Sequence, residues 1–310
     1  MARKRKGRPV NGILLLDKPT GHSSNHVLQK VRRMFNAQKA GHTGSLDPLA
    51  SGMLPICFGE ATKFSQYLLD AHKAYRVTAR LGEKTSTADA EGEVIETRPV
   101  NVTLSQLEEV IGSFLGHSMQ VPSMYSALKH QGQPLYKLAR QGIEVERKAR
   151  PIEIMALQLE SFTEQDFSMY VECSKGTYIR NLVEDIGEQL GCGAHVTVLR
   201  REWVAHFESD EMQSLDELQQ LRDEEAFTDM DALLLPVDAA LHGYPSVELD
   251  ADSAFYFKQG QCVQAALPKE SEVGQDGLIK IYDHQASFIG LATINDDLLL
   301  QPKRVISSLD

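Results

Sequence analysis

The hydrophobic residues of this 310-residue chain recur at two spacings, and a spacing of two predicts a series of β-strands. Residues 73–81 alternate most regularly, and one face of this strand carries Tyr75, Val77, Ala79 and Leu81. The alternation therefore places Tyr75 in the core of the protein. Apolar runs predict further strands at residues 10–16, 94–95, 151–160, 167–173 and 195–207, with those at 151–160 and 167–173 paired.

A spacing of three and four residues predicts helices between these strands. Residues 25–35 form an amphipathic helix after a Ser-Ser-Asn capping signal, and its outer face offers Lys30, Arg32 and Arg33. Similar spacing predicts helices around residues 64–71, 103–115 and 135–141. Another helix opens within SKGTYIRN (174–181) and is ended by Gly191 and Gly193. The polar residues 83–91 are expected to form a loop.

The last third of the chain differs in composition from the rest. Residues 202–238 hold twelve acidic side chains and one basic side chain, Arg222, which predicts a solvated helical stretch that does not face RNA. Residues 245–310 then alternate turn residues with β-rich runs at 253–257, 278–282 and 288–294. We therefore expect an α+β fold with two domains, residues 10–245 and 246–310. The first contains a mixed, largely antiparallel sheet flanked by helices, and the second is a small β domain.

Charge is distributed unevenly along the chain, whose net charge is −11. Residues 1–150 hold 22 Lys and Arg against 13 Asp and Glu, whereas residues 151–310 hold 10 against 30. Phosphate contacts act over a Debye length of roughly 8–10 Å, so the basic half can hold RNA despite the total. The alternative, that the asymmetry only affects solubility, stays open at this point.

Two segments concentrate the positive charge. Residues 1–9 carry five basic and no acidic side chains and are expected to form a disordered arm that can touch phosphate. Residues 119–150 carry six Lys and Arg against two Glu, with Tyr125 and Tyr136 between them. An RNA-clamping thumb would need such a segment, and a solvated surface hairpin would serve equally well to explain it.

Composition also bounds the compartment. The four cysteines, Cys57, Cys173, Cys192 and Cys262, have neither metal-type nor redox-type spacing. No apolar run approaches membrane-spanning length, and the basic N-terminus lacks the apolar segment of a secretory signal. We expect a cytoplasmic monomer without a metal or other cofactor.

The stretch from Gly41 to Lys63, GHTGSLDPLASGMLPICFGEATK, combines glycines and prolines with a single nearby carboxylate, Asp47. Glycine and proline at this density define a particular loop path, and Pro48 holds Asp47 in an extended or turn conformation. The isolation of this carboxylate marks it as a candidate nucleophile, although many Asp-Pro pairs only cap their own loops. Arg180 is expected in the first turn of its helix, where the helix dipole opposes a cation, so it needs a partner. Glu184 and Asp47 are the two candidates.

The same stretch resembles the active-site segment of the TruB family, the bacterial tRNA pseudouridine-55 synthases. Four other blocks resemble that family in the family's order. They are VNGILLLDKPTGHSSN (10–25), KAYRVTARLG (73–82), VPSMYSALKHQGQPLYKLARQGIEV (121–145) and CSKGTYIRNLVEDIGEQLGCGAHVTVLRR (173–201). Together the blocks cover most of residues 10–201. The resemblance implies the pseudouridine synthase sheet, with residues 119–150 as an inserted thumb and a PUA-like module at residues 246–310.

The resemblance also implies a reaction. The T-loop uridine at position 55 of tRNA is isomerised to pseudouridine after the base is flipped out of the folded T-arm. Asp47 would be the nucleophile, Arg180 its partner, and Tyr75 the residue that stacks on the flipped uracil. Because atoms and redox state are conserved in an isomerisation, the reaction needs neither a metal nor an electron carrier.

The remaining site residues follow from the resemblance as well. Tyr178 and Leu199 would line the pocket, Lys18 would brace the catalytic loop, and His42 would stack against the RNA. The PUA-like module departs from what RNA binding favours, because residues 247–310 hold ten acidic and five basic side chains.

Two other classes of protein are compatible with part of the pattern. A metal-dependent hydrolase could use His22, His26, His42 and Asp47, but these residues lack ligand-type spacing. A non-catalytic RNA-binding or tRNA-folding module would explain the charge asymmetry equally well. Such a binder has no use for a carboxylate that faces phosphate, so Asp47 favours the enzyme.

Overall fold

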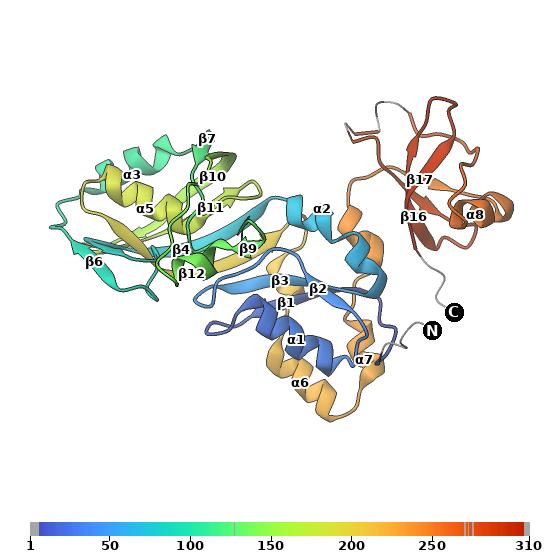
Figure 1. Cartoon of the computed structure of the whole chain (residues 1–310), viewed down its shortest axis with the longest axis horizontal. Coiled ribbons are helices and arrows are strands. Elements are labelled where there is room, and N and C mark those ends of the chain that lie inside the picture. The colour runs from blue at the N-terminus through green and yellow to red at the C-terminus, as the bar shows by residue number, and fades with distance from the viewer. Residues whose placement is uncertain (1–5, 127, 270, 272, 275, 307–310) are drawn as a thin grey trace.

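The main sheet of the protein is mixed and largely antiparallel, as expected. The computed structural model describes residues 6–126, 128–269, 271, 273–274 and 276–306. Within them the strands follow the order β13-β1-β3-β12-β4-β11-β10-β7, and β2 pairs with β3 (Figure 1). Only the β1–β13 and β3–β12 pairs are parallel among these described strands. The strands are β1 (Gly12–Lys18), β2 (Ala40–His42), β3 (Ser51–Phe58), β4 (Lys73–Leu81), β7 (Gly116–Gln120), β10 (Arg150–Phe162), β11 (Asp166–Cys173), β12 (Ala194–Val204) and β13 (Gln213–Ser214).

Strand β4 has the alternation that the sequence predicts. Tyr75 is 8% exposed and Val77 is 1% exposed, whereas Arg76 and Arg80 are exposed on the opposite face. In the register with β12, Tyr75 is opposite Arg201, and Val77 is opposite Leu199. A period of two therefore brings Tyr75 and Leu199 to the same side of the sheet.

Four helices share the main hydrophobic core on one face of this sheet. Val27, Leu107, Leu182 and Leu218, one from each helix, belong to a single buried cluster. Figure 1 shows α1 and α6 side by side below β1, with α3 and α5 at the other end of the sheet. These helices are α1 (Ser24–Met34), α3 (Leu104–Ser113), α5 (Ile179–Gln189) and α6 (Leu215–Asp223). The acidic segment is thus helical, as predicted, but one side of it is packed rather than solvated.

A second hydrophobic cluster covers the opposite face near β1 and β3. It combines Ile13 and Met53 of the sheet with Phe64, Leu68 and Leu241. These last three come from the 3₁₀ helices η1 (Gly59–Lys63) and η3 (Val237–Leu241), the helix α2 (Ser65–Asp70) and the residues between them. Leu291 of the C-terminal part belongs to the same cluster, so the two parts share buried apolar surface.

The C-terminal residues build a separate four-stranded sheet in the order β14-β15-β16-β17. Its strands are β14 (Ser246–Glu248), β15 (Ile279–Tyr282), β16 (Phe288–Ile294) and β17 (Leu300–Val305). Contacts to the first part include the rings of Phe64 and Phe288, whose centroids are 5.4 Å apart. The hydroxyl of Tyr282 also donates to Asp238 at 2.6 Å. The domain boundary at residues 245 and 246 stays a prediction.

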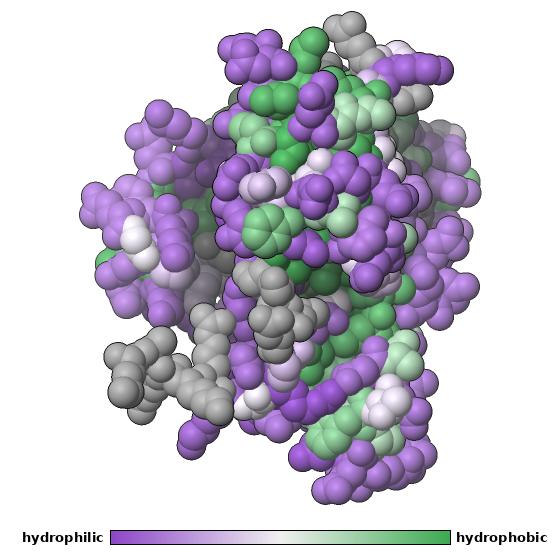
Figure 2. Space-filling model, turned by 90° about the vertical axis from the view of Figure 1, so that its right-hand side faces the viewer, coloured by the Kyte–Doolittle hydropathy of each residue, from purple (hydrophilic) through white to green (hydrophobic). Residues whose placement is uncertain are grey.

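The structure corrects the sequence analysis at residues 253–257, which were predicted as a β-rich run. They lie in helix α8 (Ala251–Lys258), whose Asp250 cap accepts a hydrogen bond from the Ser253 amide at 2.8 Å. Ala254 and Phe257 are buried three residues apart, a helical spacing that the aromatic content of the segment concealed. Figure 2 views the molecule from this end, and hydrophilic residues cover most of the face.

Two smaller predictions were also incomplete. Residues 83–91 were expected as a loop, but β5 (Glu83–Thr85) pairs there with β6 (Val94–Thr97). Arg8 was expected in a disordered arm, but its guanidinium forms an ion pair with Asp231 and lies over the ring of Phe227. Residues 1–5 of that arm lie outside the described residues.

Residues 119–150 form the predicted thumb segment around a small apolar cluster of their own. A two-residue strand pair, β8 (Lys129–His130) and β9 (Gln133–Pro134), is followed by α4 (Leu135–Ala139), close to the helix predicted at 135–141. Met124, Leu135 and Leu138 pack together beneath it. The helix α7 (Phe227–Ala232) and the 3₁₀ helix η2 (Ser209–Glu211) complete the described elements. Among the described residues, no helix is both long enough and apolar enough to span a membrane.

Candidate active site

Asp47 lies in the loop of residues 43–50 between β2 and β3, here called the Asp47 loop. Lys18 is fully buried beneath it. The Nζ atom of Lys18 donates to the carbonyl oxygens of Ala50 at 2.6 Å, Pro19 at 2.8 Å and Pro48 at 3.5 Å. Burial lowers the pKa of Lys18 to about 8, while the negative charge of Asp47 opposes this shift. Lys18 thus ties the loop to the end of β1 on both sides of Asp47.

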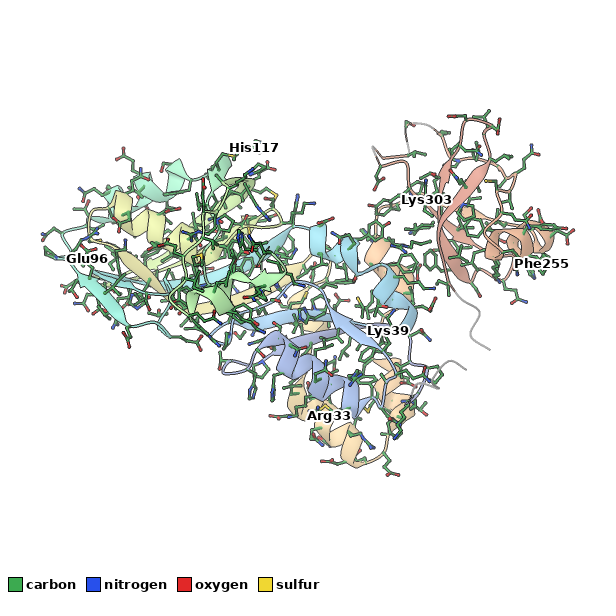
Figure 3. The ribbon with its side chains drawn as sticks, in the orientation of Figure 1. Arg33, Lys39, Glu96, His117, Phe255 and Lys303 are labelled. Atoms are coloured by element: carbon green, nitrogen blue, oxygen red, sulfur yellow. The ribbon has the colours of Figure 1, made fainter. Side chains whose placement is uncertain are left out.

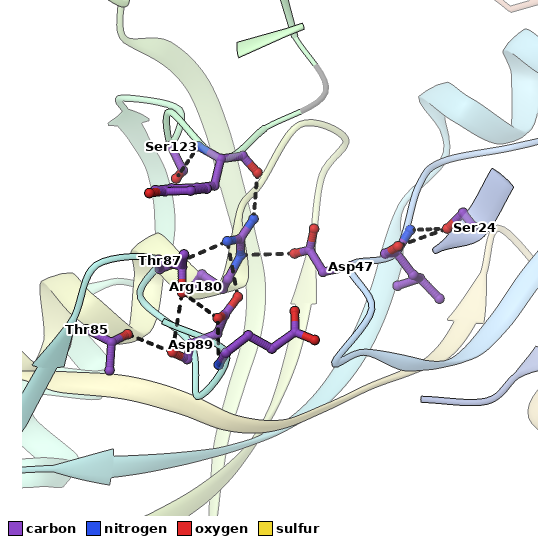
Figure 4. Close-up of polar contacts among 10 residues, drawn as sticks. Ser24, Asp47, Thr85, Thr87, Asp89, Ser123 and Arg180 are labelled. Atoms are coloured by element: carbon purple, nitrogen blue, oxygen red, sulfur yellow. Dashed lines mark hydrogen bonds and ion pairs between the residues drawn. The ribbon is translucent and has the colours of Figure 1, made fainter. Parts of the chain in front are cut away.

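The side of the loop toward α1 is fixed by a reciprocal pair of hydrogen bonds. The Oγ atom of Ser24 accepts from the amide of Leu46 at 2.7 Å and donates to its carbonyl at 2.9 Å. The amide of Gly21 donates to the carbonyl of Pro48 at 2.8 Å. Ser24 begins α1, so this helix and the Asp47 loop are anchored to each other (Figure 4).

Arg201 fixes the opposite side of the loop, and sequence reasoning did not assign it to the site. It is 1% exposed, and it donates to the carbonyls of Met53 at 2.6 Å and Gly44 at 3.1 Å. Gly44 has φ +85° and passes close to the guanidinium, where a Cβ atom would lie 3.4 Å from Nη1. The signal in the sequence was the period of two on β12, which puts Arg201 on the same face as Leu199.

Arg180 contacts Asp47 directly. Its Nε atom lies 2.9 Å from Oδ2 of Asp47, and its side chain is 6% exposed. Of the two partners considered from the sequence, the structure selects Asp47, because Glu184 lies 3.6 Å from the Nζ atom of Lys84 instead. The Nη2 atom of Arg180 also donates to the carbonyl of Tyr125 in the thumb at 2.9 Å (Figure 4).

A second carboxylate shares this guanidinium, so Asp47 is isolated in the sequence but not in space. Oδ2 of Asp89 lies 3.2 Å from Nη1 of Arg180. Asp89 is 2% exposed, and its Oδ1 atom accepts from the Thr87 hydroxyl at 2.6 Å and from the Glu91 amide at 3.1 Å. The sequence gave no signal for Asp89, because more than forty positions separate it from Asp47 and its neighbours read as an ordinary polar loop.

The charges around Asp47 act in opposite directions on its pKa. Burial raises the pKa of Asp47 above its usual value, Arg180 and Lys18 lower it, and Asp89 raises it. The Asp47 side chain is still 39% exposed, whereas that of Asp89 is 4% exposed. Asp89 therefore serves as the buried anchor for Arg180, and Asp47 is the carboxylate that an incoming molecule can reach.

Asp47 opens onto a cavity of about 860 Å³. The cavity brings together six of the seven site residues expected from the sequence, namely His42, Asp47, Tyr75, Tyr178, Arg180 and Leu199. Lys18 lies behind the loop rather than on the cavity wall. Lys73 and Arg201 also line the cavity and were not expected there.

The aromatic walls of this cavity are uncharged at neutral pH. Burial raises the pKa of Tyr75 and of Tyr178 above the usual value for a phenol. Burial and the charge of Arg201 together lower the pKa of His42. Nδ1 of His42 is buried without a hydrogen-bond partner. Neutral rings around a carboxylate–guanidinium pair can hold a planar heterocycle by stacking.

No group of three or more His, Cys, Asp or Glu side chains converges as a metal site in the described part of the chain. The rings of His22 and His26 stack on each other with centroids 4.9 Å apart, while His42 lines the cavity with Asp47. The residues of the hydrolase alternative therefore do not form one ligand set.

Comparison with known proteins assigns the chain to a class of enzyme. A sequence model of the TruB family pseudouridylate synthase N-terminal domain matches residues 32–179. Models of the tRNA pseudouridylate synthase B C-terminal domain and of the pseudouridine synthase II TruB C-terminal region match residues 180–242 and 245–306. Fold, site and matches together define a pseudouridylate synthase.

Curated relatives are similar over almost their whole length. The tRNA pseudouridine synthase B of Shewanella denitrificans is 54% identical, over 99% of this chain and 97% of that protein. The tRNA pseudouridine synthase B of Vibrio campbellii is also 54% identical, over 99% of this chain and 98% of that protein. The chain belongs to the TruB family.

Solved structures share the fold at lower identity. A Cbf5-Nop10-Gar1 complex contains a chain that superposes with a TM-score of 0.71 at 24% identity, covering 95% of this chain and 84% of that one. An archaeal box H/ACA sRNP Nop10-Cbf5 complex gives 0.71 at 21% identity, covering 98% and 92%. The likeness extends to both sheets of the protein.

Proposed function

We propose that this enzyme isomerises the T-loop uridine at position 55 of tRNA to pseudouridine, with Asp47 as the nucleophile. The observation that carries the proposal is the contact between Asp47 and Arg180 at the wall of a cavity lined by aromatic rings. The names of the relatives, tRNA pseudouridine synthase B, support tRNA as the substrate.

The reaction breaks the N-glycosidic bond, turns the uracil and joins it to the ribose through carbon. Asp47 attacks the nucleotide, which divides this exchange into two easier steps. Arg180 favours the ionised carboxylate that attack requires, and Asp89 keeps Arg180 in position from the buried side. Side chains of Tyr75 and Leu199 keep water from the detached base, which stays bound until the new bond forms.

The uridine enters the cavity by flipping out of the RNA. Flipping costs a few kcal/mol, which stacking on an aromatic ring offsets by about 1–3 kcal/mol per base. Tyr75 is the ring deepest in the cavity and receives the uracil, while Tyr178 lines its rim. His42, at the end of β2 beside the Asp47 loop, fills the space that the base leaves.

The thumb completes the RNA site on the side of Tyr125. Lys129, Lys137, Lys148 and Arg150 form no ion pair within the described residues, so their charges are available to phosphates. The enzyme is proposed to act as a monomer in the cytoplasm. Three of its four free cysteines are buried, and a reducing compartment suits such thiols.

The decisive experiment is a pseudouridine assay on unmodified tRNA with the wild-type enzyme and Asp47→Asn. Sequencing of the modified positions identifies the target, and a tRNA with cytidine at position 55 is the matched control. Pseudouridine at position 55 from the wild type alone supports the proposal. If the wild type binds tRNA and forms none, the protein is the non-catalytic RNA-binding or tRNA-folding module.

A further inference from the structure

One group of cations is not used by the proposed reaction. Lys30, Arg32 and Arg33 of α1 form what is here called the α1 basic face. Within the described residues these three side chains make no ion pair and no hydrogen bond to another side chain. Residues 18–46, which contain them, include no Asp or Glu at all.

Cations on the exposed face of the main sheet are treated differently. Arg76 contacts Glu160 at 2.9 Å, and Arg80 contacts Asp166 at 3.1 Å. Arg98 contacts both Glu96 and Glu188. Each of these charges is neutralised by a partner on the protein. The α1 basic face has no such partner, although any acidic residue at its exposed positions would have supplied one.

The geometry of α1 collects these charges on one surface. At 3.6 residues per turn, Arg33 lies seven positions after His26 and therefore on the same outward line of the helix. Arg33 is exposed, and Lys30 and Arg32 are half-buried on either flank of it. Figure 3 shows Arg33 at the end of α1 away from the Asp47 loop. The eleven residues of α1 span about 16 Å, a length that several successive phosphates of an RNA strand can follow.

This surface adjoins the catalytic loop on the side opposite the thumb. Ser24, the first residue of α1, bonds to Leu46 next to Asp47. Figure 4 places Ser24 on one side of Asp47 and Ser123, at the start of the thumb, on the other side beyond Arg180. RNA that has its target nucleotide in the cavity is therefore flanked by the thumb on one side and by α1 on the other.

We propose that the α1 basic face binds the phosphate backbone of the tRNA outside the T-arm, and so acts as a second clamp. The inference rests on the proposed function, because it takes the T-loop to lie at Asp47. In a folded tRNA the T-loop packs against another arm at the elbow, so RNA other than the T-arm lies next to a protein surface that borders the T-loop. The acidic side chains Asp216 and Glu217 on the neighbouring helix α6 limit this RNA to the other flank of α1.

The test compares two ligands and two triple variants. Lys30→Gln/Arg32→Gln/Arg33→Gln removes the α1 basic face, and Arg76→Gln/Arg80→Gln/Arg98→Gln is the control with the same change in net charge. Binding is measured by titration over a series of salt concentrations, with unmodified full-length tRNA and with the T-arm hairpin alone. Circular dichroism confirms that each variant is folded, and the single variant Arg33→Glu, at the most exposed position, repeats the test without disturbing packing.

The expected result is specific to the α1 variant and to the full-length tRNA. The slope of log affinity against log salt becomes shallower by about 2 to 3, since each phosphate contact contributes roughly 0.9. The T-arm hairpin binds all variants equally. The inference is overturned if the hairpin is weakened as much as the tRNA, or if the control variant matches the α1 variant.

The proposed function fails in a different way. Pseudouridine formation in the T-arm hairpin by the wild type tests that function and does not involve the α1 basic face. An active wild type with an unchanged α1 variant overturns only the inference. An inactive wild type overturns the proposed function, and the binding comparison can still be made.

Discussion

Arg180 holds Asp47 with its Nε atom 2.9 Å from the carboxylate, and the same guanidinium reaches Asp89 and the thumb carbonyl of Tyr125. One buried cation therefore joins the nucleophile, its electrostatic anchor and the RNA-binding insertion. This arrangement determines how each part of the site should respond to substitution.

Asp47→Asn preserves the shape of the side chain and removes the attacking carboxylate. We expect kcat to fall by more than about 10³-fold, the scale seen when a catalytic group is removed, while tRNA affinity changes little. Single-turnover assays and binding titrations measure the two effects separately. Turnover within tenfold of the wild type would contradict the role of Asp47 as nucleophile.

The same variant should gain stability at neutral pH relative to the wild type. The pKa of Asp47 is raised in the folded protein, mainly by burial, so its contribution to stability is present below the unfolded pKa and is lost as pH rises through the folded pKa. Asparagine carries no charge and avoids this loss. Urea denaturation at several pH values should give a free energy of unfolding for Asp47→Asn that is equal to or above that of the wild type at pH 7. A clear decrease would mean that the contact with Arg180 outweighs the cost of burying the charge.

Asp89→Asn tests the buried anchor. It weakens the contact with Arg180 and should lower the free energy of unfolding by about 1–3 kcal/mol, because bonds to charged groups are the stronger ones. We expect kcat to fall while the affinity for tRNA is retained, because Arg180 loses its fixed orientation toward Asp47. Glu96→Gln, which alters an exposed ion pair with Arg98, serves as the control and should change neither quantity.

Tyr75→Phe and Tyr75→Ala separate the ring from the hydroxyl. Phenylalanine keeps the stacking surface and should bind tRNA as the wild type does. Alanine loses packing in the core, at a cost of about 3 kcal/mol or more, in addition to base stacking. If Phe turns over slowly but binds normally, the hydroxyl takes part in proton movement. Equal turnover of Phe and wild type confines Tyr75 to stacking.

Neutralising the thumb should reduce the salt dependence of RNA binding. Lys129, Lys137 and Lys148 replaced by Gln remove charges that the protein itself does not pair, so the salt slope should fall by up to about 0.9 per phosphate lost. Lys258→Gln/Lys280→Gln is the comparison in the C-terminal part, where Lys258 already contacts Asp283 at 3.0 Å. The position of the modified uridine should not change. A larger effect from the C-terminal pair would identify that part as the principal clamp.

Much of the fold could be predicted because its signals are local. The alternation on β4 and the caps at Ser23 and Thr103 each depend on a few consecutive residues, and the strands and helices lie where these signals placed them. Residues 253–257 were assigned wrongly because two exposed aromatic residues hid a helical spacing. Local aromatic content and burial spacing then favour different elements, and only tertiary packing decides between them.

The candidate site was predictable only in part for a related reason. Resemblance to a family supplied Asp47, Tyr75 and Arg180, and the structure brings their side chains around one cavity. Asp89 and Arg201 reach the site through long-range contacts that no spacing in the sequence encodes. Both are buried charges whose partners come from other strands and loops, so their positions depend on the assembled sheet.

The apolar contact between the two sheets has a practical consequence for anyone who divides the protein. Leu291 packs in the same cluster as Met53 and Phe64, and the Nζ atom of Lys63 donates to the carbonyl of Val305 at 3.0 Å. A fragment that stops before residue 246 would leave this patch wet directly behind β3, the strand that leads out of the Asp47 loop. Such a truncation is a poor tool for asking what the C-terminal part does, since it alters the support of the catalytic loop along with the surface under study. Point substitutions on the outer face of the C-terminal sheet would leave that support in place.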